Sequence, residues 1–240
     1  MQPPAELPGP ESSTQEDSPK LLRVLWLGLQ AAALISCAAA CWPPLQRLLW
    51  PPPLDPAFIA LSPAEIFALP LATRLQWPMG SENGALTYNA QRFRLNRHLG
   101  ADLNGIGGGD SDWGDPVHAA GFGQVVFARE AGPGWGKMVI LAHRIGGQDS
   151  LRVIQTVYAH LRDIHVQVGQ VLQRGERLGS VGNADGRYLA HLHFEIREGA
   201  FINPGVGYAD STLNRLDPEA LLGQLGPDPA ELLHPAPGKP

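Results

Sequence analysis

The pattern of apolar and polar positions separates an N-terminal region from a folded domain. Residues 1–20 are polar and rich in Pro, Glu and Ser, so we expect them to be disordered. A mostly apolar run, Leu21–Trp42, follows and is interrupted by Arg23 and Gln30. The part from Val24 to Trp42 is close to the roughly 20 residues that a helix needs to cross a bilayer. Pro43-Pro44 is expected to end this helix.

Three interpretations apply to residues 21–42. The leading one is a transmembrane anchor, since Lys20 and Arg23 favour a cytoplasmic N-terminus and place the following chain outside. The second is a lipoprotein signal, because Leu34-Ile35-Ser36-Cys37 resembles a lipobox, whose cysteine becomes lipidated. A buried core helix is the third, and the flanking segments offer it little to pack against. The first two interpretations place the rest of the chain outside the cytoplasm.

The remaining pattern predicts one mainly β domain over residues 75–210. A Pro-rich tether over 43–74 precedes it, with one short helix expected at Pro63–Leu69, and a tail over 211–240 contains one further helix. Strand-like runs bounded by glycine-rich turns predict an antiparallel sheet with hairpins. These runs are Gly123–Ala128, Lys137–His143, Leu151–His160 and His191–Arg197.

Composition and charge narrow the classes of function. Hydrophobic residues make up 44% of the 240 residues, enough for the core of one domain of ordinary size. The net charge is -5 and no basic run occurs, so no nucleic-acid partner is expected. Both cysteines, Cys37 and Cys41, lie in the apolar run, so the domain has neither an internal disulfide nor a thiolate metal site.

The placement of the histidines is the most informative feature. In a strand, His191 and His193 point to the same face, and Leu192 packs on the other side. By itself this pair is equally well explained as a surface pair. A second motif, His98-Leu99-Gly100-Ala101-Asp102, supplies an imidazole and a carboxylate, with a glycine that lets the backbone bend. His160 ends a β-branched strand, where a lone histidine is more often structural.

Taken together, the three motifs match the chemistry of a catalytic zinc site. Two imidazoles and one carboxylate leave the fourth zinc position to water, as in hydrolytic enzymes. The two remaining histidines can position that water, take its proton or hydrogen-bond an oxyanion. The chain contains no His-Glu-x-x-His sequence, which excludes the commonest metallopeptidase pattern.

The motif set resembles that of the lysostaphin/LytM-type zinc endopeptidases, which is His-x-x-x-Asp, a separate His, and His-x-His. The resemblance covers Trp77–Tyr208 and includes Asp115-Pro116-Val117-His118-Ala119 and Asn203-Pro204. It implies a barrel-sandwich-like β-sheet groove with the metal at its floor. It further implies that the substrate is the peptide cross-links of bacterial peptidoglycan, in the cell envelope.

Residue by residue, the resemblance implies that His98, Asp102 and His193 are the Zn²⁺ ligands. It implies that His160 and His191 are an unliganded catalytic pair, one acting as the base and the other stabilising the transition state. Such a pair predicts that activity falls in mild acid, as the two histidines become charged.

Three features near these motifs bear on the groove. Gly186-Arg187-Tyr188-Leu189-Ala190 is bulkier than the corresponding family segment and is expected to narrow it. Gly105–Asp115 reads as an inserted polar rim loop, since Gly114 occupies the fifth ligand position of an EF-hand and no glutamate ends the loop. Glu195 shares a face with His193, which leaves open a contact with that histidine or a salt bridge to an arginine.

Two other classes of protein remain as alternatives. A catalytically inert relative would bind peptidoglycan or activate an amidase, and such relatives usually lack one or more zinc ligands, whereas all five key positions are filled here. A cupin-type metal protein also carries His-x-His, but its glutamate would lie farther along than Glu195, and the His98/Asp102 pair would stay unexplained. The sequence therefore favours an active zinc endopeptidase.

Overall fold

The computed structural model describes residues 18–49, 59–80, 86–146 and 151–226, with the side chains of 22–37 in the first range. Most of the predicted disordered N-terminus, part of the tether and the end of the tail lie outside the described residues. The chain divides into two compact units, Met1–Asp55 and Pro56–Pro240.

The first unit contains one helix, α1 (Ser18–Leu49), which confirms the expected N-terminal helix. The helix continues past Pro43-Pro44, so the predicted end is wrong: a proline removes one helical hydrogen bond but does not here end the helix. Cys37 is exposed on α1. Within the described part of the chain, no helix is both long and apolar enough to cross a membrane, so the transmembrane prediction is not supported.

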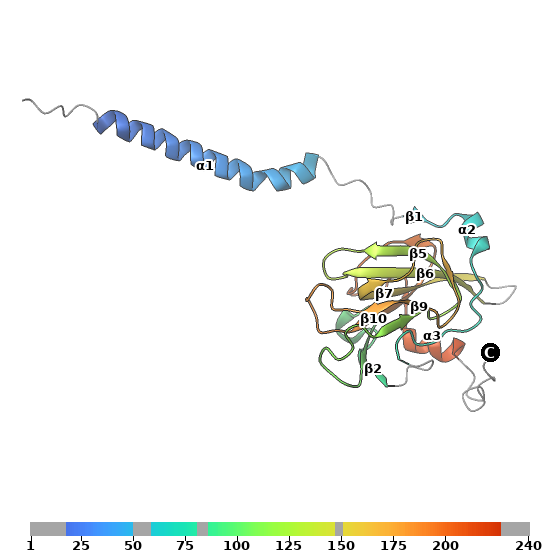
Figure 1. Cartoon of the computed structure of the whole chain (residues 1–240). Coiled ribbons are helices and arrows are strands. Elements are labelled where there is room, and N and C mark those ends of the chain that lie inside the picture. Colours follow the sequence, from blue (N-terminus) through green and yellow to red (C-terminus); the bar gives the residue numbers. More distant parts are fainter. Residues whose placement is uncertain (1–17, 50–58, 81–85, 147–150, 227–240) are drawn as a thin grey trace, which may run out of the picture. The chain divides into compact units, whose positions relative to one another are not determined.

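The second unit is mainly β, as predicted, and its named strand pairs are all antiparallel (Figure 1). Its strands are β1 (Ile59–Ala60), β2 (Thr87–Gln91), β3 (Ala101–Gly105), β4 (Pro116–His118), β5 (Gly123–Glu130), β6 (Lys137–Ile145), β7 (Arg152–Ile164), β8 (Val171–Leu172), β9 (Arg177–Val181), β10 (Leu192–Glu198), β11 (Phe201–Ile202) and β12 (Arg215–Leu216). Its helices are α2 (Pro63–Ala68), the 3-10 turn η1 (Leu95–Arg97) and α3 (Pro218–Leu225).

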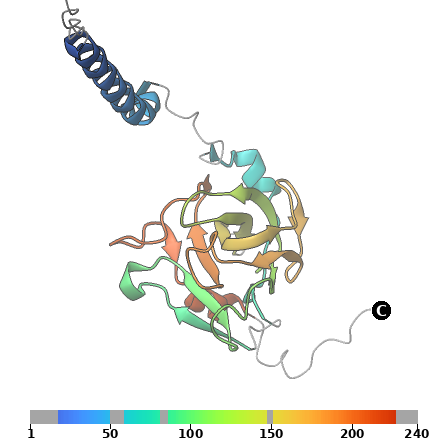
Figure 2. The same cartoon turned by 60° about the vertical axis from the view of Figure 1, so that its left-hand side comes forward.

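One large sheet carries most of the domain. Its strand order is β2-β3-β10-β7-β6-β5-β8, with β12 beside β10, and with β9 pairing both β4 and β7. Figures 1 and 2 show the long strands β5, β6, β7 and β10 side by side. All four strand-like runs of the sequence are therefore strands of this sheet.

The alternation of side chains explains how the sheet is buried. In β10, Leu192, Phe194 and Ile196 belong to the larger hydrophobic core, as predicted for Leu192. The intervening residues of a strand point to the opposite face, so His193 and Glu195 lie on the other side of β10. The core thus holds one face of β10 in place and leaves the other for polar chemistry.

Short segments at both ends of the domain complete this core. Ala72 is buried and its backbone N–H donates to the carbonyl of Arg144 at 2.8 Å. At the other end, α3 packs Leu221 and Leu222 into the larger core. The packed unit therefore extends beyond the expected range 75–210. The sequence did not indicate these flanking segments, because each buries too few residues to produce a recognisable pattern.

Candidate metal centre and active site

Three side chains bring metal-ligating atoms to one point. His98 Nε2 lies 3.2 Å from Asp102 Oδ1 and 3.0 Å from His193 Nδ1. The Asp102 and His193 atoms are 2.9 Å apart. A tetrahedral zinc ion with bonds of about 2.0–2.1 Å holds its ligand atoms about 3.3 Å apart. The triangle of donor atoms therefore fits a cation of that size.

The second nitrogen of each imidazole has its own acceptor, which orients the ring. His98 Nδ1 donates to the carbonyl of Gln91 at 3.1 Å, and His193 Nε2 donates to Glu195 Oε1 at 3.0 Å. These acceptors assign the tautomers, so that each ring turns an unprotonated nitrogen toward Asp102. Three lone-pair atoms facing one another repel unless a cation lies between them, so the donor set fits a divalent metal.

Gly100 allows the strand that carries Asp102 to approach β10. A Cβ on Gly100 would lie 2.6 Å from the carbonyl oxygen of Phe194 and 2.9 Å from His193 Cε1. Gly100 is not among the glycines with positive φ. The chain bends at Gly100, as expected, and the missing side chain also admits the close contact with the neighbouring strand.

His193 occupies the centre of the site because β10 lies between two strands. It is opposite Asp102 on β3 and opposite Ala159 on β7. This register places the Asp102 carboxylate on one side of His193 and His160 on the other. Antiparallel pairing thus brings together residues that are about 90 positions apart in the chain.

His160 lies where β7 changes its pairing partner. Ala159 pairs with β10, whereas Leu161 pairs with β9. Between them His160 has φ 62°, a left-handed conformation that is uncommon for a residue other than glycine. Its backbone N–H and its Nδ1 both donate to the carbonyl of Trp135, at 2.9 and 3.1 Å. The irregularity therefore presents the imidazole, with Nε2 uncommitted, beside His193.

Burial, together with the neighbouring His193 and His191, lowers the pKa of His160 to about 3. Its imidazole therefore stays neutral through mild acid. The loss of activity expected in mild acid does not follow from this histidine.

His191 completes the group just before β10 begins. It forms an isolated bridge with Gly182, and its Nδ1 donates to the carbonyl of Leu189 at 2.8 Å. Its Nε2 lies 3.8 Å from Asp102 Oδ1, and its ring centroid lies 4.8 Å from that of His160. The structure thus brings all five predicted residues together.

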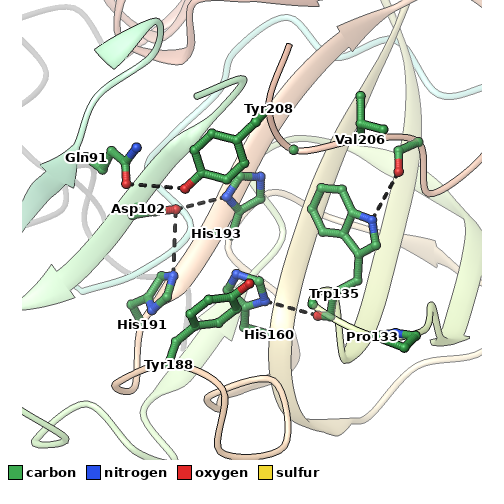
Figure 3. Close-up of a pocket in the computed structure, with 13 residues that line it drawn as sticks. Gln91, Asp102, Pro133, Trp135, His160, Tyr188, His191, His193, Val206 and Tyr208 are labelled. Atoms are coloured by element: carbon green, nitrogen blue, oxygen red, sulfur yellow. Dashed lines mark hydrogen bonds and ion pairs between the residues drawn. The ribbon is translucent and has the colours of Figure 1, made fainter. Parts of the chain in front are cut away.

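Four of the five, Asp102, His160, His191 and His193, line a pocket of about 550 Å³ (Figure 3). Tyr188 lies against His160, and Tyr208 lies on the other side of Asp102 and His193. Trp135, Gln91 and Tyr208 also line the pocket and were not singled out from the sequence. Trp135 stands in a glycine-rich turn between two strands, and this position could have marked it as a candidate pocket residue. The sequence around Gln91 and Tyr208 offers no such signal.

Charge in the site favours a cation beside His193. Burial alone would lower the pKa of His193, but hydrogen bonds to Asp102 and Glu195 outweigh it and raise this pKa to about 9. Burial alone would raise the pKa of Asp102, but His193 and His98 outweigh it and hold this pKa far below its usual range. Surroundings that favour a proton at His193 favour a metal ion at the same place.

Glu195 makes both of the contacts left open by the sequence. Oε1 accepts from His193, and Oε2 accepts from Arg197 at 2.6 Å and from Arg215 at 3.2 Å. Burial alone would raise the pKa of Glu195, but Arg197 and His193 more than offset it and bring this pKa to about 2. Glu195 is therefore a buried carboxylate in its charged form.

The loop after β3 supports the segment that leads to His191. Asp110 Oδ1 accepts from the backbone N–H of Ala190 at 2.7 Å. Asp112 is buried and accepts from Ser111 at 3.0 Å and from Asn104 at 3.3 Å. Asp110 and Asp112 therefore accept hydrogen bonds from groups of the chain itself.

Comparison with known proteins identifies the family. A model of peptidase family M23 matches residues 97–204, a range that contains all five predicted residues. Over 92 residues the chain is 32% identical to lipoprotein NlpD of Yersinia enterocolitica, which corresponds to 38% of this chain and 87% of that protein. The chain belongs to peptidase family M23, and the resemblance to lysostaphin/LytM-type peptidases is confirmed.

Other relatives match over shorter parts of their length. Peptidoglycan DD-endopeptidase ShyA of Vibrio cholerae is 36% identical over 83 residues, 35% of this chain and 17% of ShyA. The chain spans less than a third of the length of each of several curated relatives that it matches. Among solved structures, the catalytic domain of lysostaphin from Staphylococcus simulans is 25% identical, with a TM-score of 0.41 over 57% of this chain and 90% of that domain.

Proposed function

We propose that the domain is a zinc-dependent endopeptidase that hydrolyses peptide cross-links of bacterial peptidoglycan in the cell envelope. One observation carries the proposal: the donor atoms of His98, Asp102 and His193 converge, and His160 and His191 line the same pocket. The named activity of ShyA, a DD-endopeptidase of peptidoglycan, supports this substrate class.

The metal supplies Lewis-acid chemistry: bound zinc polarises a carbonyl and makes water a stronger nucleophile near neutral pH. His98, Asp102 and His193 would hold it. His160 would accept a proton at Nε2, because its Nδ1 is committed to the Trp135 carbonyl and the ring lines the pocket. His191 faces the same space, and with a second proton on Nε2 it would donate a hydrogen bond to the oxygen that gains negative charge.

A digest of purified peptidoglycan by the full-length chain, followed by mass spectrometry, tests the proposal. We expect new fragments that depend on zinc and are absent with His193→Ala. His165→Ala is a matched control, because His165 is exposed and lies outside the pocket. If neither the native chain nor this control releases fragments from walls with different cross-links, the alternative of an inert relative that binds peptidoglycan or activates an amidase replaces the proposal.

A further inference from the structure

Three buried charged side chains lie behind the metal group. Glu195 is 0% exposed, Arg197 is 2% exposed and Arg215 is 7% exposed. Charged residues are rarely buried this deeply, and a buried ion pair by itself seldom adds stability over apolar packing. Because these charged side chains lie next to His193, we relate their burial to the geometry of the metal group.

Glu195 divides its two oxygens between two tasks. Oε1 accepts from His193 Nε2, and Oε2 accepts from the Nε atoms of both Arg197 and Arg215. The first contact holds His193 in the tautomer that turns Nδ1 toward Asp102. The second leaves the outer nitrogens of both guanidinium groups available for other acceptors.

Those outer nitrogens hold the strip of residues 203–207, of which residues 205–207 form one wall of the pocket. Arg197 donates to the carbonyls of Asn203 and Pro204, and Arg215 donates to the carbonyl of Val206 at 3.1 Å. Two further donors complete the strip: Trp135 Nε1 to the carbonyl of Gly205 at 3.1 Å, and the Leu99 N–H to the carbonyl of Gly207 at 2.9 Å. Every carbonyl from 203 to 207 thus has a donor, although the strip belongs to no strand.

Gly205 shows how closely the strip fits the arginine beneath it. A Cβ at this position would lie 2.6 Å from Arg215 Nη2 and 2.9 Å from Asn203 Oδ1. Gly205 and its neighbours Val206 and Gly207 line the pocket, together with Tyr208. The position of the guanidinium group therefore sets the position of the pocket wall.

We propose that Glu195 is a positioning residue that couples the metal ligand His193, through Arg197 and Arg215, to the strip 203–207, which includes the pocket wall. The coupling rests on the proposed metal site and deepens it. Because one carboxylate contacts both sides, a metal ion bound to His193 and an ordered strip at 203–207 stabilise each other. A substrate that contacts this wall would then bind next to a metal centre whose ligand His193 is already correctly oriented.

Glu195→Gln separates this role from simple packing, since the amide keeps the shape of the side chain. If its oxygen faces His193, its NH₂ meets two guanidinium donors. If its NH₂ faces His193, the imidazole must turn a protonated Nδ1 toward the metal. Either orientation breaks one half of the contact, and we expect zinc affinity to fall about 10–100-fold.

The test uses the full-length chain and two readouts that do not require activity. Zinc affinity is measured by competition with a chromophoric chelator, and hydrogen–deuterium exchange is followed in peptides that contain residues 203–208. We expect zinc to slow exchange in this segment of the native chain and to have little effect in Glu195→Gln. Glu198→Gln is the control, because Glu198 also lies on β10 but pairs with the half-exposed Arg152 away from the site.

Native zinc affinity in Glu195→Gln, with zinc still slowing exchange at 203–208, would overturn the positioning role. If circular dichroism shows that Glu195→Gln does not fold, Arg215→Lys serves instead, since it keeps the charge and loses the bond to the Val206 carbonyl. That variant must lose the effect of zinc on exchange for the proposal to stand. A native chain that binds no zinc would refute the proposed function itself, which is a different outcome.

Discussion

Each histidine of the site commits one ring nitrogen to the protein and turns the other toward the pocket. His98, His160 and His191 donate to the carbonyls of Gln91, Trp135 and Leu189, and His193 donates to Glu195. Such acceptors set both the tautomer and the ring orientation. The four imidazoles therefore have defined chemical roles before any ligand arrives.

This division predicts that two alanine variants fail in different ways. His193→Ala removes a donor atom of the metal group, so we expect zinc content and activity to be lost together. His160→Ala leaves that group intact, so we expect normal zinc content and a kcat about 10²–10⁴-fold lower. Metal analysis of the purified variants beside their rates checks both, and loss of zinc in His160→Ala would show that the assigned roles are wrong.

At the scale of secondary-structure elements, the site depends on two departures from regular pairing. Gly100 lets the chain approach β10 more closely than a side chain would permit. The left-handed residue His160 lets β7 exchange β10 for β9 in the middle of its length. The first brings Asp102 against His193, and the second turns an imidazole toward them.

The close approach predicts opposite effects for two glycine variants. Gly100→Ala places a methyl group against a backbone carbonyl of a central strand, so we expect a loss of about 1–3 kcal/mol in unfolding free energy. Gly223→Ala lies in α3 with nothing near its Cβ, and we expect a gain of about 0.5–1 kcal/mol. Urea unfolding of both variants measures the difference. Equal effects would show that the β3–β10 contact tolerates a side chain.

At the scale of the whole molecule, a buried chain of hydrogen bonds crosses the larger core. The Ala120 N–H donates to the Tyr158 hydroxyl at 2.8 Å, which lies 2.9 Å from the Thr156 hydroxyl. Thr156 lies 2.8 Å from His143 Nε2, and His143 Nδ1 donates to the carbonyl of Phe122 at 2.8 Å. This arrangement uses the neutral imidazole, and burial lowers the pKa of His143 to about 4.

His143 therefore predicts a pH dependence of stability. Its folded pKa lies below the unfolded value of about 6.5, so the unfolded chain takes up a proton first as the pH falls. The stability is fully present above about pH 6.5 and is lost as the pH falls toward about 4. Between pH 7.5 and 5.0 this loss amounts to about 2 kcal/mol. Urea unfolding of the native chain and of His143→Gln at both pH values isolates this contribution, and the variant should lose less stability than the native chain by that amount.

By itself, the sequence determined the family and picked out the five residues that the structure brings together. Spacing along single strands reveals which residues share a face, so His191, His193 and the packing of Leu192 were predictable from local pattern. The motif set supplied His98, Asp102 and His160. It also correctly indicated a mainly β domain, the short helix α2 and the four long strands.

Only the tertiary structure decided how these parts support one another. The close contact at Gly100, the lowered pKa of His160 and the contacts of Arg215 depend on residues far apart in the chain. Local periodicity records the burial of a residue but not its partner across the sheet. The sequence pointed to Asn203-Pro204 but did not predict the ordered strip 203–207. The order of this strip comes from donors on other elements and not from strand pairing.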